Sequence, residues 1–267
     1  MRHTKCKKVF RHRIKHILCI IAVVLGSVYL CLCVSMRLTV RGTSYAEEDC
    51  MLYYIVNADG MKGLGHSIVL LVDEDGNGMV CSFNGMQRTL GESLFGKSGI
   101  GKMSIGIMTQ GEVETFLHTG ILNLEEDQLS DHYDMALYRP ITTEDYHVIL
   151  EQTAPYIAAE EQFAALYEKW AMEEDASKKA EYHQALEQLG QDESLPLYQI
   201  YTNNCDSAAR MLASSVDEAL REYTLYTWRM TPNGNWKAFG KKAENWGVMT
   251  LGEQSLTERI LMFLVIF

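Results

Sequence analysis

Cys205 stands where a helix is expected to begin, a position that favours a reactive thiol. Asn203 and Asn204 precede it, and asparagine is a good N-cap because its side-chain oxygen accepts from first-turn amides. Apolar residues follow at helical spacing as far as Val216. A first-turn cysteine meets unpaired N–H groups at the positive end of the helix dipole, which favours the thiolate. The sequence therefore predicts a nucleophile at Cys205.

His66 is the candidate base for this thiol. It opens the apolar run 66–72, which predicts a buried strand, and an Asp-Gly turn joins that strand to a second run over 79–84. The predicted hairpin returns Ser82 and Asn84 to the neighbourhood of His66. Either side chain can then orient the imidazole. The sequence leaves the choice between them open.

The two motifs, in this order, resemble the circularly permuted NlpC-like branch of the papain-like cysteine peptidases. The resemblance rests on Gly65-His66 at a strand start, on Ser82-Phe-Asn-Gly85, and on Asn203-Asn-Cys-Asp206 at a helix start. It implies an α+β papain-like fold whose antiparallel sheet packs on the nucleophile helix. It also implies Cys205 as nucleophile, His66 as base, Ser82 or Asn84 as orienting residue, and an oxyanion site near the Cys205 amide and the Asn204 side chain.

By the same resemblance, the protein is expected to be a thiol hydrolase that cleaves an amide bond through a Cys-His dyad and a thioester. Relatives in this branch include bacterial cell-wall peptidases, so peptidoglycan stem peptides are the expected substrates. One alternative is a lipid acyltransferase or thioesterase of the same fold, and another is a non-catalytic extracellular binding module. No cofactor or metal is expected, because the chain has no His-Glu-x-x-His or Cys-x-x-Cys spacing.

Charge is strongly segregated along the 267 residues. Nine of the 24 Lys and Arg residues precede Glu47, whereas all 35 Asp and Glu residues lie at or after it. Phosphate neutralisation needs a basic surface, so this acidic body argues against nucleic acid as a partner.

An uncharged run from Ile17 to Met36 follows the basic N-terminus. Twenty residues at about 1.5 Å per residue would cross a hydrocarbon core of about 30 Å, which predicts a transmembrane helix. Seven Lys and Arg residues precede the run and two follow it. This predicts a single-pass type II protein of the cell membrane, with its main domain extracellular. The alternative is secretion after signal cleavage near Ala46.

Three cysteines lie in the predicted exported body: Cys50, Cys81 and Cys205. An oxidising compartment could pair Cys50 with Cys81 and leave Cys205 as the free thiol. In the alternative, Cys50 and Cys81 both stay reduced and buried.

These patterns predict one α+β domain with appendages. The charged, alanine-rich stretch from Thr142 predicts two or three helices, interpreted as an insertion that serves as a spacer or a lid. The predicted units are a basic cytoplasmic tail (1–16), a transmembrane anchor (17–36), a stalk (37–50), the papain-like domain (51–255) with its helical insertion (142–195), and an apolar C-terminal segment (256–267).

Overall fold

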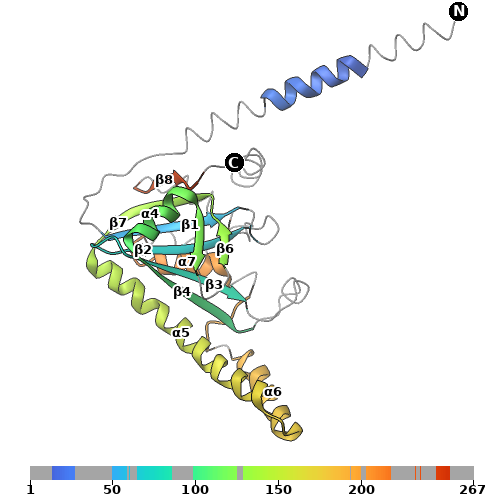
Figure 1. Ribbon diagram of the computed structural model, residues 1–267, viewed down its shortest axis with the longest axis vertical. Helices are drawn as coiled ribbons and strands as arrows, with labels where there is room; N and C mark the ends of the chain where they lie inside the picture. Colours follow the sequence, from blue (N-terminus) through green and yellow to red (C-terminus); the bar gives the residue numbers. More distant parts are fainter. Residues whose placement is uncertain are drawn as a thin grey trace, which may run out of the picture.

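The alternating apolar runs of the sequence form a six-stranded sheet in the order β4-β3-β2-β1-β7-β8, with every neighbouring pair antiparallel (Figure 1). The computed structural model describes residues 14–27, 50–58, 60, 65–85, 99–124, 129–192, 194–199, 203–217, 232, 235 and 245–252. The sheet strands are β1 (Cys50–Asn57), β2 (His66–Val72), β3 (Gly78–Gly85), β4 (Gly101–Met108), β7 (Met135–Ile141) and β8 (Gly247–Thr250).

The predicted hairpin is confirmed as β2 and β3, which pair antiparallel across the turn at 73–77. Asp73 closes this turn, because its carboxylate accepts from the backbone N–H groups of Asp75 and Asn77 at 3.0 and 2.8 Å. The strand pairing covers Val69–Val72 against Gly78–Cys81. Residues 66–68 of β2 therefore lie beyond its ladder with β3, at the end where the site forms.

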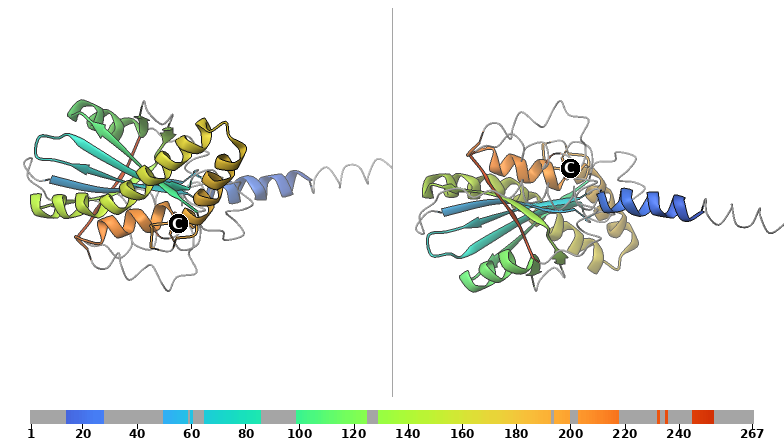
Figure 2. Two further views of the ribbon diagram at one scale, coloured as in Figure 1. Left: turned by 90° about the horizontal axis from the view of Figure 1, so that it is seen from below. Right: turned by 90° about the horizontal axis from the view of Figure 1, so that it is seen from above.

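Both faces of the sheet are buried, so successive strand residues enter two different cores. One core contains Tyr54, Val56 and Val69 together with residues of helices α5 (Thr143–Met172) and α7 (Cys205–Ala213). The other core contains alternate strand residues and the apolar side of α4 (Gln110–Thr119). Figure 2 shows α5 and α7 on one side of the sheet and α4 on the other. The α+β class and the antiparallel sheet beside the Cys205 helix are thus as expected.

The charged stretch after Thr142 forms two helices. Thr142 caps α5, since its hydroxyl accepts from the Asp145 amide at 3.0 Å. α5 packs on the sheet through Ile149 and Tyr156 and then continues past it to meet α6 (Ala176–Leu189) in a small separate core around Phe163.

Gly120 ends helix α4. It adopts a left-handed conformation with φ 72° and caps the helix directly after Thr119. The chain then forms a hairpin of β5 (Ile121–Leu124) and β6 (Leu129–His132).

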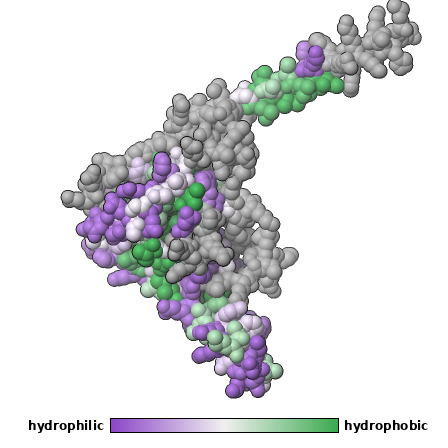
Figure 3. All heavy atoms as spheres, viewed as in Figure 1, coloured by the Kyte–Doolittle hydropathy of each residue, from purple (hydrophilic) through white to green (hydrophobic). Residues whose placement is uncertain are grey.

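The prediction of a transmembrane helix over 17–36 is wrong. The N-terminal helix described by the structure covers residues 14–27, and 28–36 lie outside the described residues. In the described part of the chain, no helix is long and apolar enough to cross a bilayer. The apolar side chains of this helix are exposed (Figure 3).

The predicted type II membrane topology and cell-membrane localisation are wrong for the same reason. The remaining terminal predictions cannot be compared with the fold. The basic tail up to residue 13, the stalk up to residue 49 and the apolar segment 256–267 lie outside the described residues.

Candidate active site

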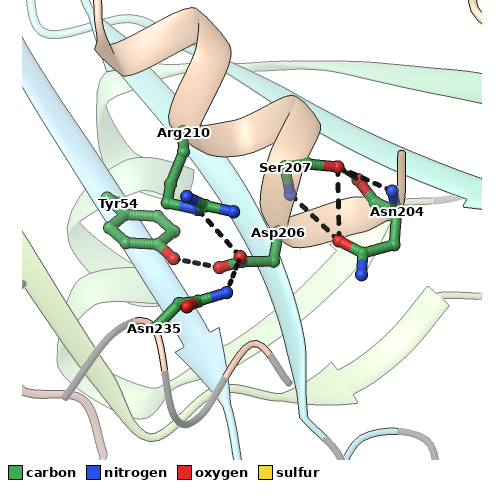
Figure 4. Close-up of polar contacts among 6 residues, drawn as sticks. All are labelled: Tyr54, Asn204, Asp206, Ser207, Arg210 and Asn235. Atoms are coloured by element: carbon green, nitrogen blue, oxygen red, sulfur yellow. Dashed lines mark hydrogen bonds and ion pairs between the residues drawn. The ribbon is translucent and has the colours of Figure 1, made fainter. Parts of the chain in front are cut away.

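Cys205 is the first residue of α7, and local sequence fixes that start. The Asn204 side-chain oxygen accepts from the Ser207 amide at 3.0 Å, while the Ser207 hydroxyl accepts from the Asn204 amide at 2.7 Å (Figure 4). This reciprocal capping box pairs two first-turn donors that would otherwise lack partners. Of the two predicted caps, Asn204 is therefore the N-cap; Asn203 instead donates its side-chain amide to the Leu197 carbonyl at 2.6 Å.

Small side chains let α7 approach the sheet closely. Ala208, Ala209 and Leu212 are buried in the core between the helix and the sheet, and Cys205 is only 2% exposed. The predicted apolar stripe is thus the side of α7 that packs against the sheet. Because the nucleophile candidate belongs to that stripe, its sulfur is covered in this conformation.

Burial is the main influence on the Cys205 thiol, and it raises the pKa to about 12. Hydrogen bonding to the backbone of Ser67 lowers the pKa of this thiol, as do the backbone amides of Asp206 and Cys205 at the helix start. The negative charge of the Asp206 carboxylate raises the pKa. The helix start therefore stabilises the thiolate as predicted, but burial outweighs it. The resting group at neutral pH is a thiol.

Ser67 places the sulfur relative to the sheet. It pairs with Val56 of β1 but lies beyond the ladder that joins β2 to β3. Its backbone hydrogen bond to Cys205 therefore sits where β2 and β3 separate. The nucleophile candidate meets β2 one residue from the candidate base, His66.

The structure resolves the ambiguity over the residue beside His66. Nε2 of His66 lies 3.0 Å from the Ser82 hydroxyl, and the Asn84 side-chain amide donates to the same hydroxyl at 3.0 Å. Ser82 is fully buried and His66 nearly so. When Nε2–H donates to Ser82, the lone pair of His66 is on Nδ1, the tautomer that a base acting through Nδ1 requires. Ser82 thus contacts the ring, and Asn84 supports Ser82.

The Cys205 and His66 side chains leave their elements toward different sides of the sheet. Strand alternation places Ser67 on the α7 face and His66 on the α4 face. In agreement, the His66 ring centroid lies 6.4 Å from that of Tyr133, which belongs to the α4 core. No hydrogen bond joins the Cys205 thiol to the His66 imidazole, both of which the structure describes. The structure brings the predicted residues to one end of the sheet without forming the dyad.

The predicted oxyanion residue Asn204 has its side-chain oxygen committed to the helix cap. Only the nitrogen end of that amide can donate to an oxyanion. The Cys205 backbone N–H remains at the expected place, in the first turn beside its own sulfur.

A buried polar cluster beside Cys205 was not anticipated from the sequence. Asp206 accepts from the hydroxyl of Tyr54, from Arg210 Nε at 2.8 Å and from the Asn235 side-chain amide at 2.6 Å (Figure 4). The only local signal is the i,i+4 spacing of Asp206 and Arg210, which allows a helical ion pair. Tyr54 and Asn235 are too distant in sequence to be predicted as partners.

Cys50 and Cys81 are free and buried thiols, so the predicted pairing between them is not formed. The register explains why. Cys81 pairs with Val69, which pairs with Tyr54, so Cys81 lies two strands away from β1 and four residues along it from Cys50. Two strand spacings alone give about 9.6 Å, beyond the Cα separation of about 7 Å that a disulfide tolerates.

The chemistry available at this end of the sheet is that of one thiol, one imidazole and their hydrogen-bond partners. Among the described residues, no group of three or more His, Cys, Asp and Glu side chains is arranged to hold a metal ion. Comparison of the chain with family models, with curated proteins and with solved structures found no match.

Proposed function

We propose that the protein is a thiol hydrolase that cleaves an amide bond, with Cys205 as nucleophile and His66 as base. The observation that carries the proposal is the position of Cys205 as the first residue of α7, a helix that packs on β2, the strand that begins at His66. Backbone N–H donors gathered at one sulfur stabilise the thiolate that a nucleophile must become.

In the proposed reaction, His66 accepts the Cys205 proton and the thiolate attacks the carbonyl carbon of the amide. The tetrahedral oxyanion is stabilised by the Cys205 backbone N–H. Collapse breaks the C–N bond, and His66 returns the proton to the departing amine. Water, deprotonated by His66, then hydrolyses the thioester, which releases the carboxylic acid and restores the thiol.

This chemistry requires a conformational step at the start of β2. Cys205 is 2% exposed and the His66 ring contacts Ser82 on the other side of the strand. Substrate entry must uncover the sulfur and bring the imidazole to it, since catalytic hydrogen bonds often tighten only in the substrate complex. The thiol pKa of about 12 then has a role, because it keeps Cys205 protonated and unreactive until that step.

Peptidoglycan stem peptides are the proposed substrates, by the likeness of the two motifs to the NlpC-like branch. The decisive experiment is to incubate the full-length protein with muropeptides and search for cleaved products and an acyl adduct on Cys205 by mass spectrometry. We expect cleavage to be lost in Cys205→Ser and in His66→Ala but kept in Cys81→Ser, a matched change of a buried thiol on β3. Cleavage that persists in Cys205→Ser would refute the proposal.

A non-catalytic binding module is the second candidate, and one observation favours it. The Cys205 thiol is buried and protonated and does not contact His66, as expected of a site that has kept its fold without its chemistry. Muropeptide binding without turnover, unchanged in Cys205→Ser, would identify this function. An acyl-lipid substrate would instead show as a fatty-acyl adduct on Cys205 after incubation with phospholipid vesicles.

A further inference from the structure

The first turn of α7 carries a fully buried carboxylate whose partners come from three parts of the chain. Asp206 has no exposed surface, and its oxygens accept from Tyr54 on β1, Arg210 one turn along α7, and Asn235 (Figure 4). Tyr54 and Arg210 are themselves buried. The cluster is a buried polar network beside the first turn of α7.

Such a network is a costly way to pack a helix on a sheet. Burying a carboxylate and a guanidinium sacrifices their hydration, and apolar residues of similar volume often stabilise a core as well or better. Arg210 also has a buried Nη1 atom that lacks a hydrogen-bond partner among the residues that the structure describes. Directional hydrogen bonds, unlike apolar contacts, fix one orientation of the groups that they join.

Asp206 and Cys205 are consecutive residues on α7, so their side chains point about 100° apart around the helix axis. Asp206 reaches β1 through Tyr54, while Cys205 reaches β2 through the Ser67 backbone. In the register, Tyr54 pairs with Val69 and Ser67 pairs with Val56. Tyr54 and Ser67 are thus diagonal neighbours on adjacent strands, about 7–8 Å apart.

Attachments on two adjacent strands add direction to the apolar packing of α7 and favour one rotation of the helix about its own axis. Burial, and then the Asp206 charge, raise the pKa of Tyr54 well above its usual value, so its hydroxyl retains the proton that it donates. The Tyr54 hydroxyl is therefore a hydrogen-bond donor to Asp206 at neutral pH.

We propose that Asp206 is a positioning residue that ties the first turn of α7 to Tyr54 of β1 and thereby holds the Cys205 sulfur at the Ser67 amide of β2. This inference rests on the proposed role of Cys205 as nucleophile. Asp206 does not touch the reacting atoms; it acts through the helix that carries them.

The test is hydrogen exchange measured by mass spectrometry on the full-length protein and its Tyr54→Phe variant. The variant loses one hydroxyl, and Asp206 keeps Arg210 and Asn235 as partners. We expect exchange to become about fivefold faster in peptides covering Ser67 and the first turn of α7, and to stay unchanged in β7, because only the local attachment is lost. Tyr53→Phe is the matched control, since Tyr53 lies on the opposite face and stacks on Tyr138.

A uniform acceleration that includes β7 would show a purely stabilising role and overturn the proposal. Unchanged exchange at Ser67 in folded Tyr54→Phe, or the same acceleration in Tyr53→Phe, would also overturn it. The double variant D206L/R210M removes the acceptor of the Tyr54 hydroxyl together with both buried charges, and it should reproduce the local acceleration. Exchange requires no substrate, so failure to find hydrolysis would refute the proposed function and leave this result standing.

Discussion

Nε2 of His66 lies 3.0 Å from the hydroxyl of Ser82, across the end of the sheet where β2 and β3 separate. The Asn84 amide donates to that hydroxyl and so contributes to the orientation of the ring only indirectly. The position of the imidazole is therefore determined by a strand residue whose side chain is fully buried.

Ser82→Ala should impair the site more than Asn84→Ala. The first change removes the partner of His66 and leaves the Asn84 amide without its acceptor, whereas the second leaves the His66–Ser82 contact in place. We expect Ser82→Ala to lower kcat/KM on a cleaved peptide by about tenfold or more and the unfolding free energy by about 1–3 kcal/mol. Peptide hydrolysis assays and urea denaturation measure the two effects. A larger loss of activity in Asn84→Ala would contradict the assignment of Ser82 as the ring partner.

The protein should lose stability as the pH rises above 9. Burial raises the pKa of Cys81 and of Cys205 to about 12, against 9.0 for the ordinary thiol. Below pH 9 both thiols are protonated in the folded and unfolded states. Between 9 and 12 only the unfolded chain ionises, so each thiol costs about 1.4 kcal/mol by pH 10.

Denaturant unfolding between pH 7 and 10 measures this slope. Cys205→Ser and Cys81→Ser should each remove the part of this pH dependence that comes from the replaced thiol, whatever their effect on stability at pH 7. A slope unchanged in both variants would show that other groups cause the loss.

Arg210→Met should be more damaging than the removal of the whole ion pair. The single change leaves the Asp206 carboxylate buried with only Tyr54 and Asn235 as donors, a loss of about 3–5 kcal/mol. The double variant D206N/R210M carries no buried charge and should recover a large part of that stability. Thermal and urea unfolding of the two variants and of the unchanged protein measure this difference in stability. A double variant no more stable than Arg210→Met would argue against a coupled pair.

Two glycines at opposite ends of α4 should respond in opposite ways to alanine. Gly120 has φ 72°, and a Cβ atom there would lie 2.5 Å from the Tyr133 carbonyl oxygen, so Gly120→Ala should cost about 1–3 kcal/mol. Gly111 lies in the first turn with no atom within 4 Å of the added Cβ, so Gly111→Ala should stabilise by about 0.5–1 kcal/mol. Melting temperatures of the two variants provide the comparison; stabilisation by Gly120→Ala would contradict the left-handed cap.

Sequence patterns were sufficient where the interactions are local. Two apolar runs joined by an Asp-Gly turn predicted the β2–β3 hairpin, and the asparagines before Cys205 predicted the start of α7. These features depend on contacts within a few residues, which a pattern records directly. The hydropathy of the N-terminal run predicted a transmembrane helix, whereas no helix in the described part of the chain is long and apolar enough to cross a bilayer.

The sequence by itself thus determined the hairpin, the helix start and the types of residue available for chemistry. Only the tertiary structure decided how they meet: Ser82 rather than Asn84 contacts His66, and Asp206 pairs with Tyr54, which lies 152 residues away in the chain. It also buried the Cys205 sulfur and placed it on the sheet face opposite His66. The physical reason is that strand register and helix rotation are set by the packing of distant segments, and a shift of one residue reverses the face on which a side chain lies.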